Sequence, residues 1–245
     1  MAHEAEQTRA TAVSERLEEI RARMESSARR AGRDSGEVTL VAVSKTHPAE
    51  AVREATLAGV TDFGENRVQE AEAKIGELRA EAPDVRWHLI GHLQANKARR
   101  AARLFDVIQS VDSAALVMKL ERACADDGRR RLDAFVQVSL ADEATKSGAS
   151  EEELPAVVEA FKSCERVRLA GLMTLPPFFE DAERVRPYFR RLRGLRDRLA
   201  RSGAFGGAEG HLSMGMSNDF EVAVEEGATI VRVGTAIFGE RLARG

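Results

Sequence analysis

Several features that would define whole classes of protein are missing from this 245-residue sequence. No run of about 18 consecutive apolar residues occurs, and the polar, acidic start at residues 1–6 lacks the basic and apolar regions of a secretory signal peptide. The only two cysteines, Cys124 and Cys164, lie far apart and outside any CxxC pattern, which suits a reducing compartment. The small negative net charge of −3 argues against a strongly basic surface that binds nucleic acid. We therefore expect a cytoplasmic protein that binds neither nucleic acid nor a membrane.

What the sequence does contain is a repeated alternation of short apolar runs and amphipathic stretches. A helical segment at 4–31, with Val13, Leu17 and Ile20 at three- and four-residue spacing, is broken by the glycine-bounded stretch 32–36. Eight apolar runs follow, and each ends in small or polar residues. These runs are 38–43, 60–63, 86–90, 107–108, 132–138, 169–173, 211–213 and 230–233.

This alternation predicts an α/β fold built on parallel strands. Strands that alternate with helices pair in parallel through right-handed crossovers. Eight such units favour a closed (β/α)8 TIM barrel, which typically needs about 250 residues. An open doubly wound sheet is the alternative. No linker or repeat marks a second domain, so we predict one barrel domain over residues 1–245, with an extra N-terminal helix within residues 1–36.

Reactive side chains are expected where the predicted strands end, because the loops that follow the strands of a parallel barrel form one rim. Lys45 follows directly after the first strand, with no carboxylate beside it in the sequence. Burial at the barrel mouth would disfavour its ammonium form and free an amine that can condense with an aldehyde. The alternative is an ordinary surface lysine at a strand–loop junction.

Two loops near the end of the sequence have the composition of a phosphate site. The first joins the seventh strand to the next helix, and Ser217 or Asn218 is expected to cap that helix, whose free N–H groups favour a phosphate. Gly215 permits close backbone approach, and Gly234 with Thr235 repeats the arrangement after the eighth strand. Loops at these two places are the recurrent phosphate site of such barrels. The alternative is a pair of ordinary tight loops.

Arg232 interrupts the apolar run of the last strand, where a charge is costly unless it is paired. One interpretation is an ion pair with a carboxylate inside the barrel. The other is a guanidinium that contacts a ring nitrogen of a ligand and keeps that nitrogen unprotonated, which makes the ring a weaker electron sink.

Six stretches together resemble the YggS/PROSC group of pyridoxal phosphate homeostasis proteins, which is related to the N-terminal barrel of bacterial alanine racemases. The resemblance runs from about residue 38 to residue 241, and several unbroken matches in the same order make it highly specific. The stretches are LVAVSKT at 40–46, FGENRVQE at 63–70, WHLIGHLQANK at 87–97, GLMT at 171–174, LSMGMSND at 212–219 and VRVGTAIFG at 231–239.

The resemblance implies that the protein binds pyridoxal 5′-phosphate (PLP) and that Lys45 is the Schiff-base lysine. It also implies that Arg232 faces the pyridine nitrogen and that Asn66 lies beside the cofactor. His92 and Met173 match the pattern and are expected to line the site. The residues expected around the phosphate are Ser213, Ser217, Gly234 and Thr235.

The function that the resemblance implies is intracellular PLP homeostasis, in which the protein holds PLP on Lys45 and stores, buffers or delivers it without substantial turnover, with apo forms of PLP enzymes as recipients. A monomer is expected, because the racemase domain that completes the partner subunit is missing. The alternative is a PLP-dependent amino-acid racemase of weak or narrow activity. The related racemases carry a further β domain with a tyrosine acid/base, and the only tyrosine here is Tyr188, in the helix predicted after the sixth strand. A PLP-free lysine aldolase does not suit Arg232, and an adaptor protein would need an exposed apolar stripe.

Overall fold

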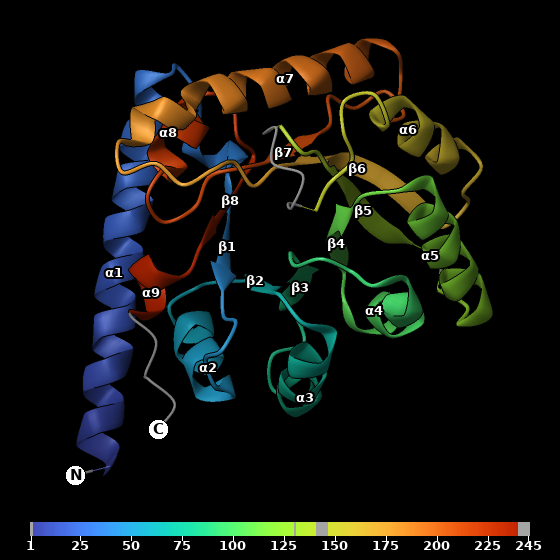
Figure 1. The fold of residues 1–245 in the computed structure, drawn as a ribbon. Helices are drawn as coiled ribbons and strands as arrows, with labels where there is room; N and C mark the ends of the chain where they lie inside the picture. Colours follow the sequence, from blue (N-terminus) through green and yellow to red (C-terminus); the bar gives the residue numbers. More distant parts are fainter. Residues whose placement is uncertain (1, 130, 141–146, 240–245) are drawn as a thin grey trace.

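A closed barrel of eight parallel strands forms the centre of the molecule (Figure 1). The computed structural model describes residues 2–129, 131–140 and 147–239, with side chains from Thr11 onward. Each strand pairs with the next along the chain, and β8 pairs with β1, which confirms the predicted (β/α)8 barrel. The strands are β1 (Thr39–Val43), β2 (Asp62–Glu65), β3 (Arg86–Leu89), β4 (Val107–Val111), β5 (Leu132–Gln137), β6 (Val167–Met173), β7 (His211–Ser213) and β8 (Ile230–Val233).

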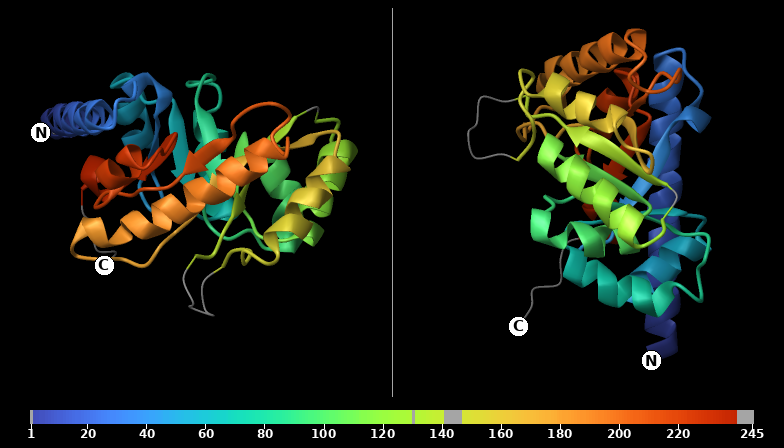
Figure 2. Two further views of the ribbon diagram at one scale, coloured as in Figure 1. Left: turned by 90° about the horizontal axis from the view of Figure 1, so that it is seen from above. Right: turned by 90° about the vertical axis from the view of Figure 1, so that its right-hand side faces the viewer.

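Helices surround the barrel and connect its strands (Figures 1 and 2). None of the helices in the described part of the chain combines the length and apolarity that a bilayer crossing requires. The α-helices are α1 (Ala2–Arg30), α2 (Ala49–Leu57), α3 (Val68–Leu78), α4 (Ala98–Leu104), α5 (Ala114–Asp126), α6 (Leu154–Lys162), α7 (Arg186–Arg201), α8 (Phe220–Glu225) and α9 (Thr235–Phe238). Short 3-10 turns are η1 (Ser35–Glu37), η2 (Ala95–Lys97) and η3 (Ala182–Val185).

The N-terminal helix α1 lies along the outside of the barrel, against α8 and α9 (Figure 1). Its apolar stripe is buried as the spacing predicts, with Leu17 and Ile20 almost inaccessible to solvent. Each such side chain contributes roughly 1.5–3 kcal/mol when it is fully buried. An ion pair of 2.9 Å joins Arg23 of α1 to Glu221 of α8. The extra helix is therefore an integral part of the packed structure.

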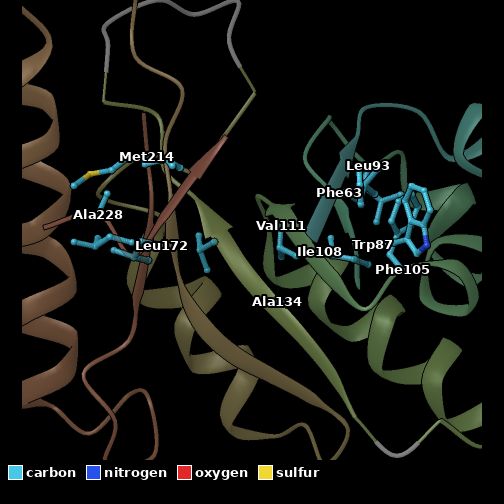
Figure 3. Packing of buried hydrophobic residues seen from close by; sticks show 14 of the residues in the cluster. Phe63, Trp87, Leu93, Phe105, Ile108, Val111, Ala134, Leu172, Met214 and Ala228 are labelled. Atoms are coloured by element: carbon cyan, nitrogen blue, oxygen red, sulfur yellow. The ribbon is translucent and has the colours of Figure 1, made fainter. Parts of the chain in front are cut away.

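Two apolar clusters support the strands. The larger one lies between the strands and the outer helices, and Phe63, Trp87 and Phe105 are among its bulkiest members (Figure 3). Side chains alternate between the two sides of each strand, so the smaller cluster fills part of the barrel interior. Its members are Val41, Val107, Phe135, Ala170, Met173 and Ile230.

Strands β7 and β8 have the predicted boundaries, and the other six differ from the prediction by one to three residues at an end. The second strand is predicted at 60–63, whereas β2 spans Asp62–Glu65. The fourth is predicted at 107–108, whereas β4 continues to Val111 and includes the polar residues Gln109 and Ser110, both fully buried. The prediction ends a strand at its first polar residues. A strand continues through polar residues when the barrel interior offers them hydrogen-bond partners, as it does for Gln109.

Candidate functional site

A cavity opens at the end of the barrel where the strands run out into the βα loops. Its volume is about 670 Å³, which falls within the range of roughly 300–1,000 Å³ typical of small-molecule sites. Six of the seven residues predicted to hold a cofactor line this cavity, and Ser213 does not. The six are Lys45, Asn66, Ser217, Arg232, Gly234 and Thr235.

Lys45 lies just beyond β1, half-buried, in the wall of the cavity. The residue that follows it, Thr46, has a φ of 67°, in the left-handed region that residues with a side chain rarely adopt. The Thr46 N–H donates a hydrogen bond to Glu70 Oε1 at 2.5 Å, so helix α3 holds this turn in place. Backbone strain of this kind concentrates at functional sites, where the surrounding structure enforces it.

A buried ion pair supports the residue before Lys45. Ser44 Oγ donates to Glu65 Oε1 at 2.7 Å, and Lys74 Nζ donates to the same oxygen at 2.5 Å. Lys74 Nζ also donates to the backbone carbonyl of Ser44 at 2.7 Å. Burial raises the pKa of the Glu65 carboxyl, although Lys74 acts in the opposite direction. The sequence analysis did not predict this cluster of Ser44, Glu65 and Lys74, because the three residues belong to separate parts of the chain.

Ser217, Gly234 and Thr235 meet at the cavity wall, where the loops after β7 and β8 come together. Ser217 Oγ accepts hydrogen bonds from the Gly234 N–H at 3.3 Å and from Thr235 Oγ1 at 3.2 Å. A Cβ at position 234 would lie 3.3 Å from the carbonyl oxygen of Val43, so a side chain there would crowd β1. The two loops thus gather two hydroxyls and a backbone N–H, a set of donors that suits a phosphate.

The loop after β7 takes its shape from Gly215 and Asp219. Gly215 has a φ of 94°, and a Cβ there would lie 2.5 Å from Ala223 Cβ, so only glycine fits. Asp219 Oδ1 accepts a hydrogen bond from the Met216 N–H at 2.6 Å. Burial raises the pKa of the Asp219 carboxyl.

The prediction that Ser217 or Asn218 caps the helix after this loop is wrong. Helix α8 begins at Phe220, and the residue before it is Asp219. Asn218 Nδ2 donates instead to the backbone carbonyl of Phe179 at 3.0 Å. The Ser217 hydroxyl is turned toward the loop after β8, which leaves it in the cavity wall.

Arg232 is only 2% exposed, yet it reaches the cavity. Its Nη1 donates to Ser213 Oγ at 2.5 Å and its Nη2 to the carbonyl of Thr174 at 2.9 Å. Burial lowers the pKa of Arg232 to about 10, so the guanidinium stays charged at neutral pH. Within the described residues no carboxylate contacts it, and Asp219 favours its charge without a direct bond. The ion pair considered from the sequence is therefore absent from this part of the chain.

Ser213 lies behind Arg232 and not in the cavity wall. It is fully buried, and its hydroxyl accepts from Arg232 and donates to Gln109 Oε1 at 2.6 Å. Met173, expected to line the site, is part of the apolar cluster inside the barrel. The sequence places both residues correctly at strand ends, but the alternation of side chains and the depth of the barrel decide which residues reach the cavity.

Asn66 reaches the cavity because a glycine faces its backbone. A Cβ at Gly91 would lie 2.3 Å from the Asn66 carbonyl oxygen, so only glycine lets the loops after β2 and β3 approach this closely. His92 also lines the cavity, as expected. Its side chain is half-exposed, with Nδ1 3.3 Å from Asp112 Oδ2.

Further lining residues come mainly from loops that carry no recognisable pattern. Leu175 and Phe178 are 37% and 74% exposed and form an apolar lip at the cavity. The lining residues to which the sequence analysis assigned no individual role are Val43, Ile90, Gly91, Gln137, Val138, Ser139, Leu140, Ser147, Leu175, Pro176, Phe178, Met216 and Asp219.

Comparison with known proteins agrees with this fold. Residues 16–242 match the family model of the alanine racemase N-terminal domain. The barrel therefore falls in the class of alanine racemase-like barrels.

Within that class, several curated relatives carry the same name. The pyridoxal phosphate homeostasis protein of Aquifex aeolicus is 43% identical over 93% of this chain and 97% of its own length. The protein of the same name from Pseudomonas aeruginosa is 44% identical over 94% of this chain and 96% of its own length. PipY of Synechococcus elongatus, solved with PLP bound, is 40% identical, with a TM-score of 0.81 over 93% of this chain and 100% of its own. The chain belongs to the family of pyridoxal phosphate homeostasis proteins, as the resemblance implies.

Proposed function

We propose that this chain binds PLP as a Schiff base on Lys45 and serves intracellular PLP homeostasis as a carrier with little turnover of its own. The observation that carries the proposal is that one cavity is lined by Lys45, by Arg232 and by the cluster of Ser217, Gly234 and Thr235. The names of the relatives and the PLP bound to PipY support it.

Three chemical groups of PLP, its aldehyde, its phosphate and its ring nitrogen, each have a suitable partner among the residues of the cavity. When bound, PLP supplies an aldehyde that links reversibly to an amine, and Lys45 offers that amine. Ser217, Gly234 and Thr235 offer O–H and N–H donors to the phosphate. Arg232 offers an N–H to the ring nitrogen, and because a guanidinium holds its protons tightly, that nitrogen stays unprotonated.

The racemase alternative has less support. An unprotonated ring nitrogen is a poor electron sink, and racemisation also needs an acid/base group on each face of the substrate carbon. The only tyrosine, Tyr188, packs against Phe179 with ring centroids 5.9 Å apart and does not line the cavity. The relatives from Aquifex aeolicus and Pseudomonas aeruginosa are named for homeostasis and not for racemisation.

Three further parts of the proposal concern the setting in the cell. We place the protein in the cytoplasm, where Cys124 and Cys164, which form no disulfide, would stay reduced. We propose that it is a monomer and that apo forms of PLP enzymes receive its PLP. Gel filtration with light scattering tests whether the protein is a monomer. Transfer of PLP is tested by reactivation of an apo aminotransferase, which should be faster with the loaded protein than with an equal amount of free PLP.

Attachment at Lys45 is tested by borohydride reduction followed by peptide mass spectrometry. Wild-type protein should carry the reduced PLP adduct on Lys45, and Lys45→Ala should carry none and lose the visible absorbance of the bound cofactor. Lys97→Ala is the matched control, since this lysine bonds to Gln69 at 3.2 Å and does not line the cavity. An adduct on Lys97, or on Lys146, which lies outside the described residues, would contradict the proposal.

A further inference from the structure

A continuous chain of hydrogen bonds crosses the barrel interior from Arg232 to Asp62. Arg232 Nη1 is 2.5 Å from Ser213 Oγ, which is 2.6 Å from Gln109 Oε1. Gln109 Nε2 is 2.9 Å from His88 Nδ1, and His88 Nε2 is 2.8 Å from Asp62 Oδ1. The five residues come from β8, β7, β4, β3 and β2, and none is more than 5% exposed. The proposed cofactor contacts use only the first of them.

The guanidinium determines the direction of every bond in this chain. Arginine has only N–H donors, so Ser213 Oγ accepts from Arg232 and its single O–H donates to Gln109. Gln109 must then turn its amide oxygen to Ser213 and its NH₂ group to His88. It follows that His88 Nδ1 is the acceptor and that its ring proton lies on Nε2, which donates to Asp62. The chain begins at a cation and ends at an anion, with neutral groups between them.

Asp62 is well suited to be the anionic end. Thr61 Oγ1 donates to its Oδ2 at 2.8 Å, and an Arg86 nitrogen lies 3.5 Å from its Oδ1. Burial raises the pKa of the Asp62 carboxyl, but the interactions with His88, Thr61 and Arg86 together outweigh burial and bring the pKa below its usual value. Asp62 also lines a second cavity, between α1 and the amino-terminal ends of β1 and β2. A carboxylate at one end of the barrel is thus linked to the buried cation at the other.

We propose that Asp62, His88, Gln109 and Ser213 are positioning residues, which hold the Arg232 guanidinium aimed at the ring nitrogen of the cofactor. The inference rests on the proposed function, because it takes Arg232 to face that nitrogen. Two N–H groups of Arg232 are bound to Ser213 and Thr174, which restricts rotation of the guanidinium and leaves its other N–H groups for a ligand. Binding sites gain affinity when supporting hydrogen bonds hold the contacting side chain in place beforehand.

The contact with the ring nitrogen can be isolated by comparing PLP with 1-deaza-PLP, in which a C–H replaces that nitrogen. Wild-type protein should bind PLP more tightly by about tenfold or more, the contribution of one hydrogen bond from a charged donor. In Ser213→Ala and Gln109→Leu the ratio of the two dissociation constants should fall toward one. Ser110→Ala is the matched control, because this neighbouring serine is equally buried but its hydroxyl has no hydrogen-bond partner within the described residues. It should keep the wild-type ratio.

The outcomes separate the two proposals. If wild-type protein binds both ligands equally, Arg232 does not face the ring nitrogen, and that part of the proposed function fails together with this inference. If wild-type protein prefers PLP and the Ser213 and Gln109 variants keep the full preference, the chain does not position Arg232, and the proposed function stands. Nitrogen-15 NMR of the wild-type imidazoles, with His88 assigned by His88→Gln, gives a test that needs no variant to bind. A proton on Nε2 at about pH 8 is expected, and a proton on Nδ1 would overturn the direction of the chain.

Discussion

Replacing Lys74 with methionine should strongly destabilise the protein, because it leaves a buried carboxylate without its partner. Lys74 is 6% exposed and Glu65 is 0% exposed, and the two are 2.5 Å apart. The other Glu65 oxygen has no hydrogen-bond partner within the described residues. Removing one member of a buried ion pair typically costs about 3–5 kcal/mol, since the remaining charge is neither solvated nor paired. Lys74→Met should lower the free energy of unfolding by that amount at about pH 8.

The cost should depend on pH in a defined direction. Burial already raises the pKa of Glu65 in the folded protein, and loss of Lys74 removes two of the three interactions that oppose this rise, leaving only the hydrogen bond from Ser44. Between the unfolded and the folded pKa, the native state of Lys74→Met binds more protons than the unfolded state, so its stability falls as pH rises through this window. The difference from wild type should therefore be smaller at about pH 5 than at about pH 8. Glu65→Gln combined with Lys74→Met should remove this pH dependence.

Denaturant unfolding of the variants at both pH values measures the effect. Lys162→Met is the control, because it breaks the exposed pair of Lys162 with Glu159, whose nitrogen and oxygen are 2.6 Å apart and whose side chains are 64% and 69% exposed. Such pairs contribute at most about 1 kcal/mol. The reasoning is refuted if Lys74→Met costs no more than Lys162→Met, or if its cost is the same at both pH values.

Two further predictions concern the cofactor. Ser217→Ala together with Thr235→Ala should weaken PLP binding more than pyridoxal binding, by about tenfold for each lost hydrogen bond to the phosphate. Titrations with both ligands measure this difference, and equal weakening would place the phosphate elsewhere. With alanine or serine in deuterated water, α-proton exchange measured by NMR should stay far below the turnover of ordinary enzymes, on the order of 1 s⁻¹ or faster, because Arg232 leaves the ring nitrogen a weak electron sink. Exchange at an enzymatic rate would establish a racemase-like enzyme instead of a carrier.

Much of the fold could be read from the order of residues, because hydrophobic periodicity is a local property. The stripe of Leu17 and Ile20 predicts a helix that the structure contains, and eight apolar runs predict the eight strands. The rule that reactive groups follow the strands led to Lys45 and to the loops after β7 and β8. The prediction stopped short at β4, since Gln109 has a polar side chain whose partners lie on other strands.

The sequence by itself determined the number and order of the strands and most of the side chains that follow them. Only the tertiary structure decided which of them meet. Closure of the barrel brings Gln109 of β4 to Ser213 of β7, although 104 positions separate them in the sequence. It likewise places Lys74 of α3 beneath Ser44. The physical reason is that alternation and periodicity depend on neighbouring residues, whereas contacts across the barrel depend on the register and closure of the whole sheet.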